Sequence, residues 1–202
     1  MIYRRQEKMI IMWWNNEILG RNSYQVLLWF VAYSVLGWFV ESVYMSICNR
    51  KITNRGFVRG PMCPIYGFGA LTVFFILRPY SDYPVRLFFM GMFLATTLEF
   101  ITAHIMQKVF GEIWWEYREK PFNYKGIICL ESSIAWGFYT VALFLFLHKA
   151  VTNMVDRVPV RTGKILGSVI LGAYLIDFSI TMYKEKNNSS SRLDDNNEVT
   201  IQ

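Results

Sequence analysis

Four ionisable side chains stand inside long apolar runs, where they could bind a cation or pass a proton. A charged group in hydrocarbon costs at least about 2.5–3.5 kcal/mol on insertion scales, so such residues usually face a bundle interior or a wet cavity. We therefore predict that these residues belong to a substrate or ion path. They are Glu41, Glu99, Glu131 and His104.

Three of these residues, together with Asp177, also have a structural explanation, which the sequence leaves open. Glu41 and Glu131 could pair with basic residues of the neighbouring loops and hold those loops to the helices. His104 stands alone on an apolar face, where a packing hydrogen bond competes with proton relay or metal ligation. Asp177 lies close enough to the end of an apolar run to be an interfacial residue.

A second group of unusual residues lies in the segment 54–69, NRGFVRGPMCPIYGFG. Proline fixes its own backbone and disfavours helix at the preceding residue, while glycine permits conformations that other residues avoid. We therefore expect a shaped loop that dips back into the membrane edge. The candidates for binding or gating in this loop and in the later one are Asn54, Arg55, Arg59, Cys63, Tyr66, Trp115 and Cys129.

The composition indicates a membrane protein. Of 202 residues, 53% are hydrophobic and 18% are charged, against about 45–50% and about 25% in soluble domains. The net charge is +6, but the basic residues fall between apolar runs, as membrane insertion and anionic lipid select. We therefore expect the lipid bilayer as a partner and no nucleic acid.

The apolar runs predict an all-α, polytopic membrane helix bundle with about five transmembrane helices. A basic interfacial segment at 1–23 precedes the membrane domain at 24–183, and a disordered polar tail follows at 184–202. The second span is short of the roughly twenty residues that cross a bilayer, so it must borrow from the loop before it. The spans are expected at 24–48, 65–77, 85–109, 127–147 and 165–183.

The ionisable residues gather on one side of the predicted bundle. At 1.5 Å per residue, Glu41 lies about 10 Å, Glu131 about 6 Å, His104 about 8 Å and Glu99 about 15 Å from the face that carries the loops at 49–64 and 110–126. This placement predicts a polar pocket that opens toward those loops. Lys and Arg divide almost equally between the two faces, so the positive-inside rule does not orient the chain.

The two long loops share a short pattern. The segments 59–63 and 125–129 both read basic, Gly, x, x, Cys ahead of a span, which chance or a duplicated two-span unit would explain. The cysteines form no CxxC pair; they could bridge, bind a soft metal or simply begin helices. We expect no metal and no cofactor.

Several catalytic motifs are missing from the sequence. It holds no GxxxxGK[ST] phosphate loop, HExxH, GxSxG or Rossmann fingerprint. We therefore expect no ATPase activity in this chain. An enzymatic role of another kind stays an alternative.

Four segments of the sequence resemble a known family. The strings LGWFVES, NRGFVRGPMCPIYGFGA, ATTLEF and WWEYREKPFNYKGIICLE resemble the CmpB-like family of type IV ABC-transporter permeases, which are bacterial integral membrane proteins. The likeness covers about Tyr33 to Leu147. It implies a multi-pass protein of the bacterial plasma membrane, a permease subunit that needs a separate ATPase subunit.

The resulting hypothesis is a transporter permease subunit that moves a small solute or ion through the pocket beside the two loops. Glu41, Glu99 and Glu131 would attract a cation or relay protons, and Arg55 and Arg59 would gate or bind an anionic group. One alternative is a membrane-embedded enzyme that uses carboxylates with cysteine or histidine. Another is a membrane scaffold or sensor, and a homo-oligomer also stays open.

Overall fold

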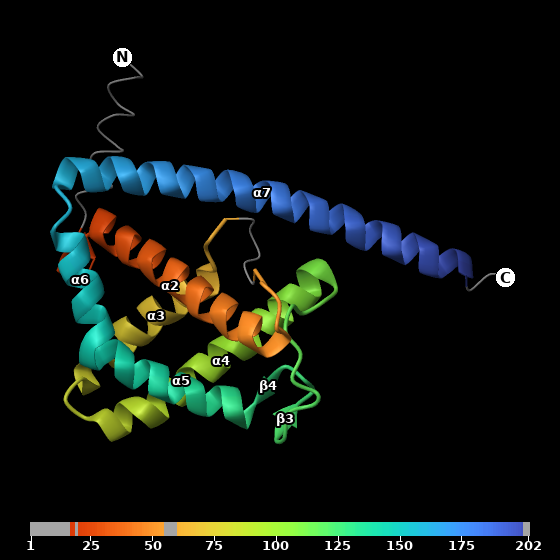
Figure 1. Cartoon of the computed structure of the whole chain (residues 1–202), viewed down its shortest axis with the longest axis horizontal. Helices are drawn as coiled ribbons and strands as arrows, with labels where there is room; N and C mark the ends of the chain where they lie inside the picture. The colour runs from red at the N-terminus through yellow and green to blue at the C-terminus, as the bar shows by residue number, and fades with distance from the viewer. Residues whose placement is uncertain (1–16, 19, 55–59, 200–202) are drawn as a thin grey trace, which may run out of the picture. The chain divides into compact units, whose positions relative to one another are not determined.

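The described part of the chain is mostly helical, as the apolar runs predict (Figure 1). The computed structural model describes residues 17–18, 20–54 and 60–199. Most of the predicted interfacial segment, together with Arg55 and Arg59, lies outside these residues. The helices are α2 (Ser23–Asn49), α3 (Pro64–Leu77), α4 (Pro84–Phe110), α5 (Leu130–Ala142), α6 (His148–Asp156) and α7 (Val160–Val199).

The strands are short and pair locally. β1 (Glu17–Ile18) pairs antiparallel with β2 (Arg21–Asn22) just before α2. β3 (Asn123–Tyr124) pairs antiparallel with β4 (Ile128–Cys129), with Asn123 opposite Cys129. The second pair shapes the loop between α4 and α5.

Within the described residues, four helical segments are long and apolar enough to cross a membrane. They are Ser23–Asn49, Pro84–Phe110, Leu130–Asp156 and Val160–Lys184. The third joins α5 to α6 through a π-helical turn, η2 (Leu143–Leu147). α3 has 14 residues and is about 21 Å long, which is less than the roughly 30 Å of hydrocarbon. The multi-pass helical prediction is confirmed, with α3 as the short member.

Two helices continue beyond the predicted ends of their spans. α6 occupies positions where the sequence predicted a loop, because Val151 and Val155 bury an apolar stripe although most of its other residues are polar. α7 runs on through 184–199, where the sequence predicted disorder. That segment contains no Gly or Pro to break the helix.

The chain divides into two compact units, each described by itself. The first comprises Met1–Leu71 and Phe146–Asp177, and the second comprises Thr72–Leu145 and Phe178–Gln202. In the first unit, α6 packs against α2, and Trp29, Val151 and Val155 are buried. In the second unit, α4 and α5 lie along each other as a hairpin (Figure 1).

Glycines let α4 and α5 approach closely. A Cβ added at Gly91 would meet the side chain of Thr140, and one added at Gly137 would meet the ring of Phe88 at 2.7 Å. Without a hydrophobic driving force in lipid, small residues that permit close packing are a main source of helix association. The α4–α5 hairpin therefore depends on these two contacts.

We predict that Gly91→Ala loosens this hairpin. The new methyl group would collide with Thr140, and overpacking of this kind costs about 1–3 kcal/mol of unfolding free energy. In a Cys48→Ser/Cys63→Ser background, Cys129 is the remaining thiol and is 3% exposed, so its labelling by a thiol-reactive dye reports unfolding in detergent. Gly172→Ala is the matched control, because nothing lies within 4 Å of its added Cβ. Equal stability of the two variants would contradict the prediction.

Candidate functional site

The first loop folds back along α2 instead of making a simple turn. The backbone N–H of Cys63 donates to the carbonyl of Ser34 at 3.0 Å. Ser34 lies about 22 Å along the helix axis from Asn49, the end of α2, so the loop returns to about the middle of the span. α3 begins there at Pro64. The segment that leads into α3 therefore returns to the middle of α2, and this level explains why α3 is short.

Side chains of the same unit pair the polar groups of this loop. The backbone N–H of Gly60 donates to Oδ2 of Asp177 at 3.1 Å. Nε1 of Trp38 donates to Oδ1 of Asn54 at 2.6 Å. Non-helical backbone is tolerated at membrane depth only when its polar groups are satisfied by protein or by cavity water. Asp177, for which the sequence predicts an interfacial position, thus serves the loop.

Close packing of α3 on α2 directs Tyr66 toward Glu41. A Cβ added at Gly37 would meet the Tyr66 side chain, and one added at Gly67 would meet Ser34. Oη of Tyr66 donates to Oε2 of Glu41 at 2.7 Å, the length typical of a strong bond to a carboxylate. The structure therefore brings together two of the predicted site residues.

Glu99 occupies a second site inside the α4–α5 hairpin, where it is 6% exposed. Oη of Tyr117 donates to Oε1 at 2.9 Å, and Nε1 of Trp136 donates to Oε2 at 3.0 Å. The hydroxyl of Ser132 lies 3.5 Å from Oε2 but only 3.0 Å from the carbonyl of Cys129, which is the better acceptor for its single proton. Each carboxylate oxygen thus has a short bond from a neutral donor.

The loop between α4 and α5 supplies Tyr117, one of the two donors to Glu99. Nε1 of Trp115 donates to the carbonyl of Ile127 at 2.8 Å and fixes the loop across the β3–β4 pair. Gly126 has a φ of 71°, and a side chain there would collide with the carboxylate of Glu116. Burial, reinforced by the negative charge of Glu99, raises the pKa of Tyr117. The phenol therefore keeps the proton that it donates.

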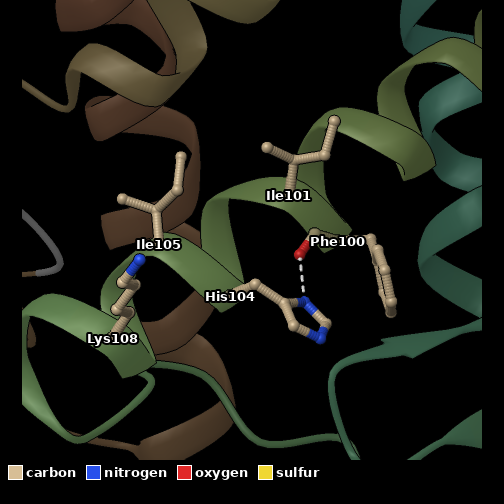
Figure 2. A pocket seen from close by; sticks show the side chains of 5 residues that line it. All are labelled: Phe100, Ile101, His104, Ile105 and Lys108. Carbon is tan, nitrogen blue, oxygen red and sulfur yellow. Dashed lines mark hydrogen bonds between the residues drawn. The ribbon is translucent and has the colours of Figure 1, made fainter.

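Two predicted pathway residues, Glu131 and His104, are exposed. The side chain of Glu131 is 57% exposed and forms an ion pair with Lys120 at 3.0 Å, as in the rim-pairing explanation. His104 is exposed, and its Nδ1 donates to the Phe100 carbonyl at 2.8 Å (Figure 2). It lines a mostly apolar groove with four other residues of α4, namely Phe100, Ile101, Ile105 and Lys108. A pathway role for either residue stays a prediction.

The cysteines are free thiols and two of them precede helices. Sγ of Cys129 accepts a hydrogen bond from the backbone N–H of Ser132 at 3.4 Å and so caps α5. Cys63 precedes α3 and is half-buried, whereas Cys48 is exposed. Among the residues that the structure describes, no group of three His, Cys, Asp or Glu side chains could hold a metal ion.

The structure groups the predicted residues into two local sites. Glu41 lies with Tyr66 near the start of α3, and Asn54 contacts Trp38 in the same unit. Glu99 belongs to the second unit, together with Trp115, Cys129 and Glu131. A single pocket shared by all the acids therefore stays a prediction.

Sequence reasoning missed the donors that hold Glu99. Ser132, Trp136 and Thr140 recur every four residues and so lie on one face of α5. This spacing could have identified Trp136, because Tyr and Trp usually find a hydrogen-bond partner when buried. Tyr117 carries no comparable signal, since it reaches Glu99 only through the fold of its loop.

Both sites suit ion binding or proton exchange better than covalent catalysis. Glu41 and Glu99 are each held by neutral O–H or N–H donors. The thiol of Cys129 is used in a helix cap, so its geometry does not mark it as a nucleophile.

One comparison with known proteins finds a match. A family model described as "Putative ABC-transporter type IV" matches residues 28–182, from the first turns of α2 into α7. No curated protein and no solved structure matches the chain. The matched range contains both of the glutamate sites.

We predict that Tyr117→Phe destabilises the second unit and changes its response to alkali. At neutral pH the loss of a bond to a charged acceptor costs about 1.5–3 kcal/mol. The wild-type phenol is protonated in the folded state at a pH where the unfolded chain loses that proton, near a pKa of about 10. The contribution of Tyr117 to wild-type stability is therefore constant below that pH and is lost above it, and Tyr117→Phe removes this part of the alkaline loss.

Both effects are measured by monitoring unfolding through the labelling of Cys129. The measurement is repeated at pH values from neutral to strongly alkaline. Tyr124→Phe is the matched control, because Tyr124 lies in the same loop and is 52% exposed. An unchanged alkaline loss in Tyr117→Phe would show that the Tyr117 phenol is not responsible.

Proposed function

This chain belongs to the type IV ABC-transporter family and is a multi-pass membrane protein of a transporter, and we propose that it is the permease subunit that moves a small solute or ion past its re-entrant loop. The path runs beside the loops at 49–64 and 110–126. Because the chain itself has no ATP-binding motif, a separate ATPase subunit supplies the energy. The assembly resides in the bacterial plasma membrane.

The observation that carries this proposal is the depth at which α3 begins. Cys63 is bonded to Ser34 in the middle of a membrane-length helix. Irregular backbone at that depth belongs where it is buried in protein or lines a water-filled cavity. Transporters build their substrate sites from such discontinuous helices. The start of α3 also carries a partial positive charge from the helix dipole.

The glutamates have distinct roles in the proposed path. Glu41, held by Tyr66, attracts a cation or takes up a proton beside the start of α3. Glu99, held by Tyr117 and Trp136, does the same within the α4–α5 hairpin. Glu131 and Lys120 form a charged rim. Arg55 and Arg59 gate the path or bind an anionic group.

We predict that water reaches Cys63 from one side of the membrane. In a Cys48→Ser/Cys129→Ser background, a small membrane-impermeant thiol reagent should label Cys63 in sealed vesicles, because the reagent reacts with thiolates, which form in water. The matched control is Phe39→Cys in a chain without the three native cysteines. Phe39 lies on α2 at membrane depth, 57% exposed, and should face lipid, so its cysteine should stay unlabelled.

Labelling of Cys63 that is no faster than that of the Phe39→Cys control would contradict a water-filled path at the loop. Intact secondary structure by circular dichroism keeps this outcome from being confused with misfolding.

We also predict that an ATPase subunit co-purifies with the tagged chain from bacterial membranes in mild detergent. In the purified assembly, Glu41→Gln should change ATP hydrolysis at least several-fold, because the carboxylate lies beside the substrate path. Glu119→Gln is the control, since Glu119 is an exposed residue of the loop between α4 and α5. Absence of any ATPase after crosslinking in intact membranes would contradict the permease assignment.

A further inference from the structure

His148 is a membrane-embedded histidine that the sites above do not use. It begins α6 and lies within the membrane-length segment Leu130–Asp156, about 12 Å from the end of that segment. It is half-buried against α2. Intramembrane histidines are functional candidates because they can bind and relay protons.

Two hydroxyl groups flank the imidazole. Oη of Tyr33 lies 2.7 Å from Nδ1, and Oγ1 of Thr152 lies 3.4 Å from Nε2. Tyr33 itself is 3% exposed. The ring of Trp29 packs against the imidazole with the two ring centroids 4.7 Å apart. The ring is therefore enclosed by α2 on one side and by its own helix on the other.

A hydroxyl group can act as either donor or acceptor of a hydrogen bond, whereas a backbone carbonyl can only accept. A hydroxyl can donate to a neutral imidazole nitrogen and, after rotation, accept from the N–H that replaces it. A backbone carbonyl can only accept, as at His104, where the Phe100 oxygen fixes Nδ1 as a donor. Tyr33 and Thr152 can therefore satisfy both nitrogens of His148 before and after it takes up a proton.

Arg21, a basic residue beside the Trp29 ring, is paired with an acid. Arg21 forms an ion pair with Asp156 at 3.0 Å, and Gln25 also donates to Asp156 at 2.9 Å. The Arg21 guanidinium also lies 5.7 Å from the centroid of the Trp29 ring, the ring that packs against His148.

Two lysines, Lys164 and Lys149, are the next basic residues to consider around His148. From α7, Nζ of Lys164 lies 5.9 Å from the centroid of the Tyr24 ring. Lys149 follows His148 but is exposed. His148, Thr152 and Asp156 recur every four residues and so lie on one face of α6, and the side chain of Asp156 is 40% exposed.

We propose that His148, held between the hydroxyl groups of Tyr33 and Thr152, is a proton-binding site inside the membrane domain. The proton binds to the nitrogen that is unprotonated in the neutral ring, and both hydroxyl groups then act as acceptors. The bound proton lies next to Tyr33, one residue before the Ser34 carbonyl that holds the start of α3. This site is separate from the glutamate sites and does not depend on the transported substrate.

The chain has only two histidines, His104 and His148, which makes a direct test practical. Full-length His104→Gln protein with isotope-labelled histidine, in nanodiscs of zwitterionic lipid, gives one imidazole signal by NMR. This signal should titrate reversibly between about pH 5 and pH 8. Tyr33→Phe should lower its pKa by about one unit, because charge-assisted bonds to the imidazolium are stronger than bonds to the neutral ring.

Two substitutions of Thr152 test whether its hydroxyl group stabilises the protonated imidazole. Thr152→Val removes the second hydroxyl and should also lower the pKa of His148, whereas Thr152→Ser keeps the hydroxyl and should restore it. Thr102→Val is the matched control, because the Thr102 hydroxyl donates to the Leu98 carbonyl and should leave the titration unchanged. A His148 signal that does not change with pH, or a pKa that is equal in Thr152→Val and Thr152→Ser, would overturn the proposal.

Discussion

Polar groups placed inside a membrane must find their partners within the protein, and this constraint accounts for the main features of the structure. Glu41 is bonded by Tyr66, Glu99 by Tyr117 and Trp136, and the N–H of Gly60 by Asp177. Each bond joins segments that would otherwise be independent: a helix start, a loop and a distant helix. Because leaving such groups unpaired costs several kcal/mol in hydrocarbon, the acids organise the loops around them.

The same constraint explains the short helix α3. A loop that returns to the level of Ser34 needs only half a membrane thickness of helix to reach the opposite face, which the 14 residues of α3 provide. Gly37 and Gly67 permit the close approach of α2 and α3 that this arrangement requires. Packing, the returning backbone and the position of Glu41 are therefore parts of one arrangement.

The two glutamate sites resemble each other locally. In each hairpin a cysteine precedes the second helix, and the third residue of that helix, Tyr66 or Ser132, lies next to the glutamate of the first helix. The likeness agrees with the pattern of basic, Gly, x, x, Cys in both loops. The sites also differ, since Ser132 is closer to the Cys129 carbonyl than to Glu99 and leaves the stronger bonds to Tyr117 and Trp136.

The sequence by itself determined the membrane class, the approximate helices, the shaped loop before α3 and the acids, because hydropathy and the effects of proline and glycine are properties of neighbouring residues. It did not identify the partners of those acids or the site at His148. Tyr117 and Trp136 are 18 and 37 positions from Glu99, and Tyr33 is 115 positions from His148. Only the tertiary structure decided these pairs, since a hydrogen bond requires atoms within about 3 Å, and folding sets that distance between residues far apart in the chain.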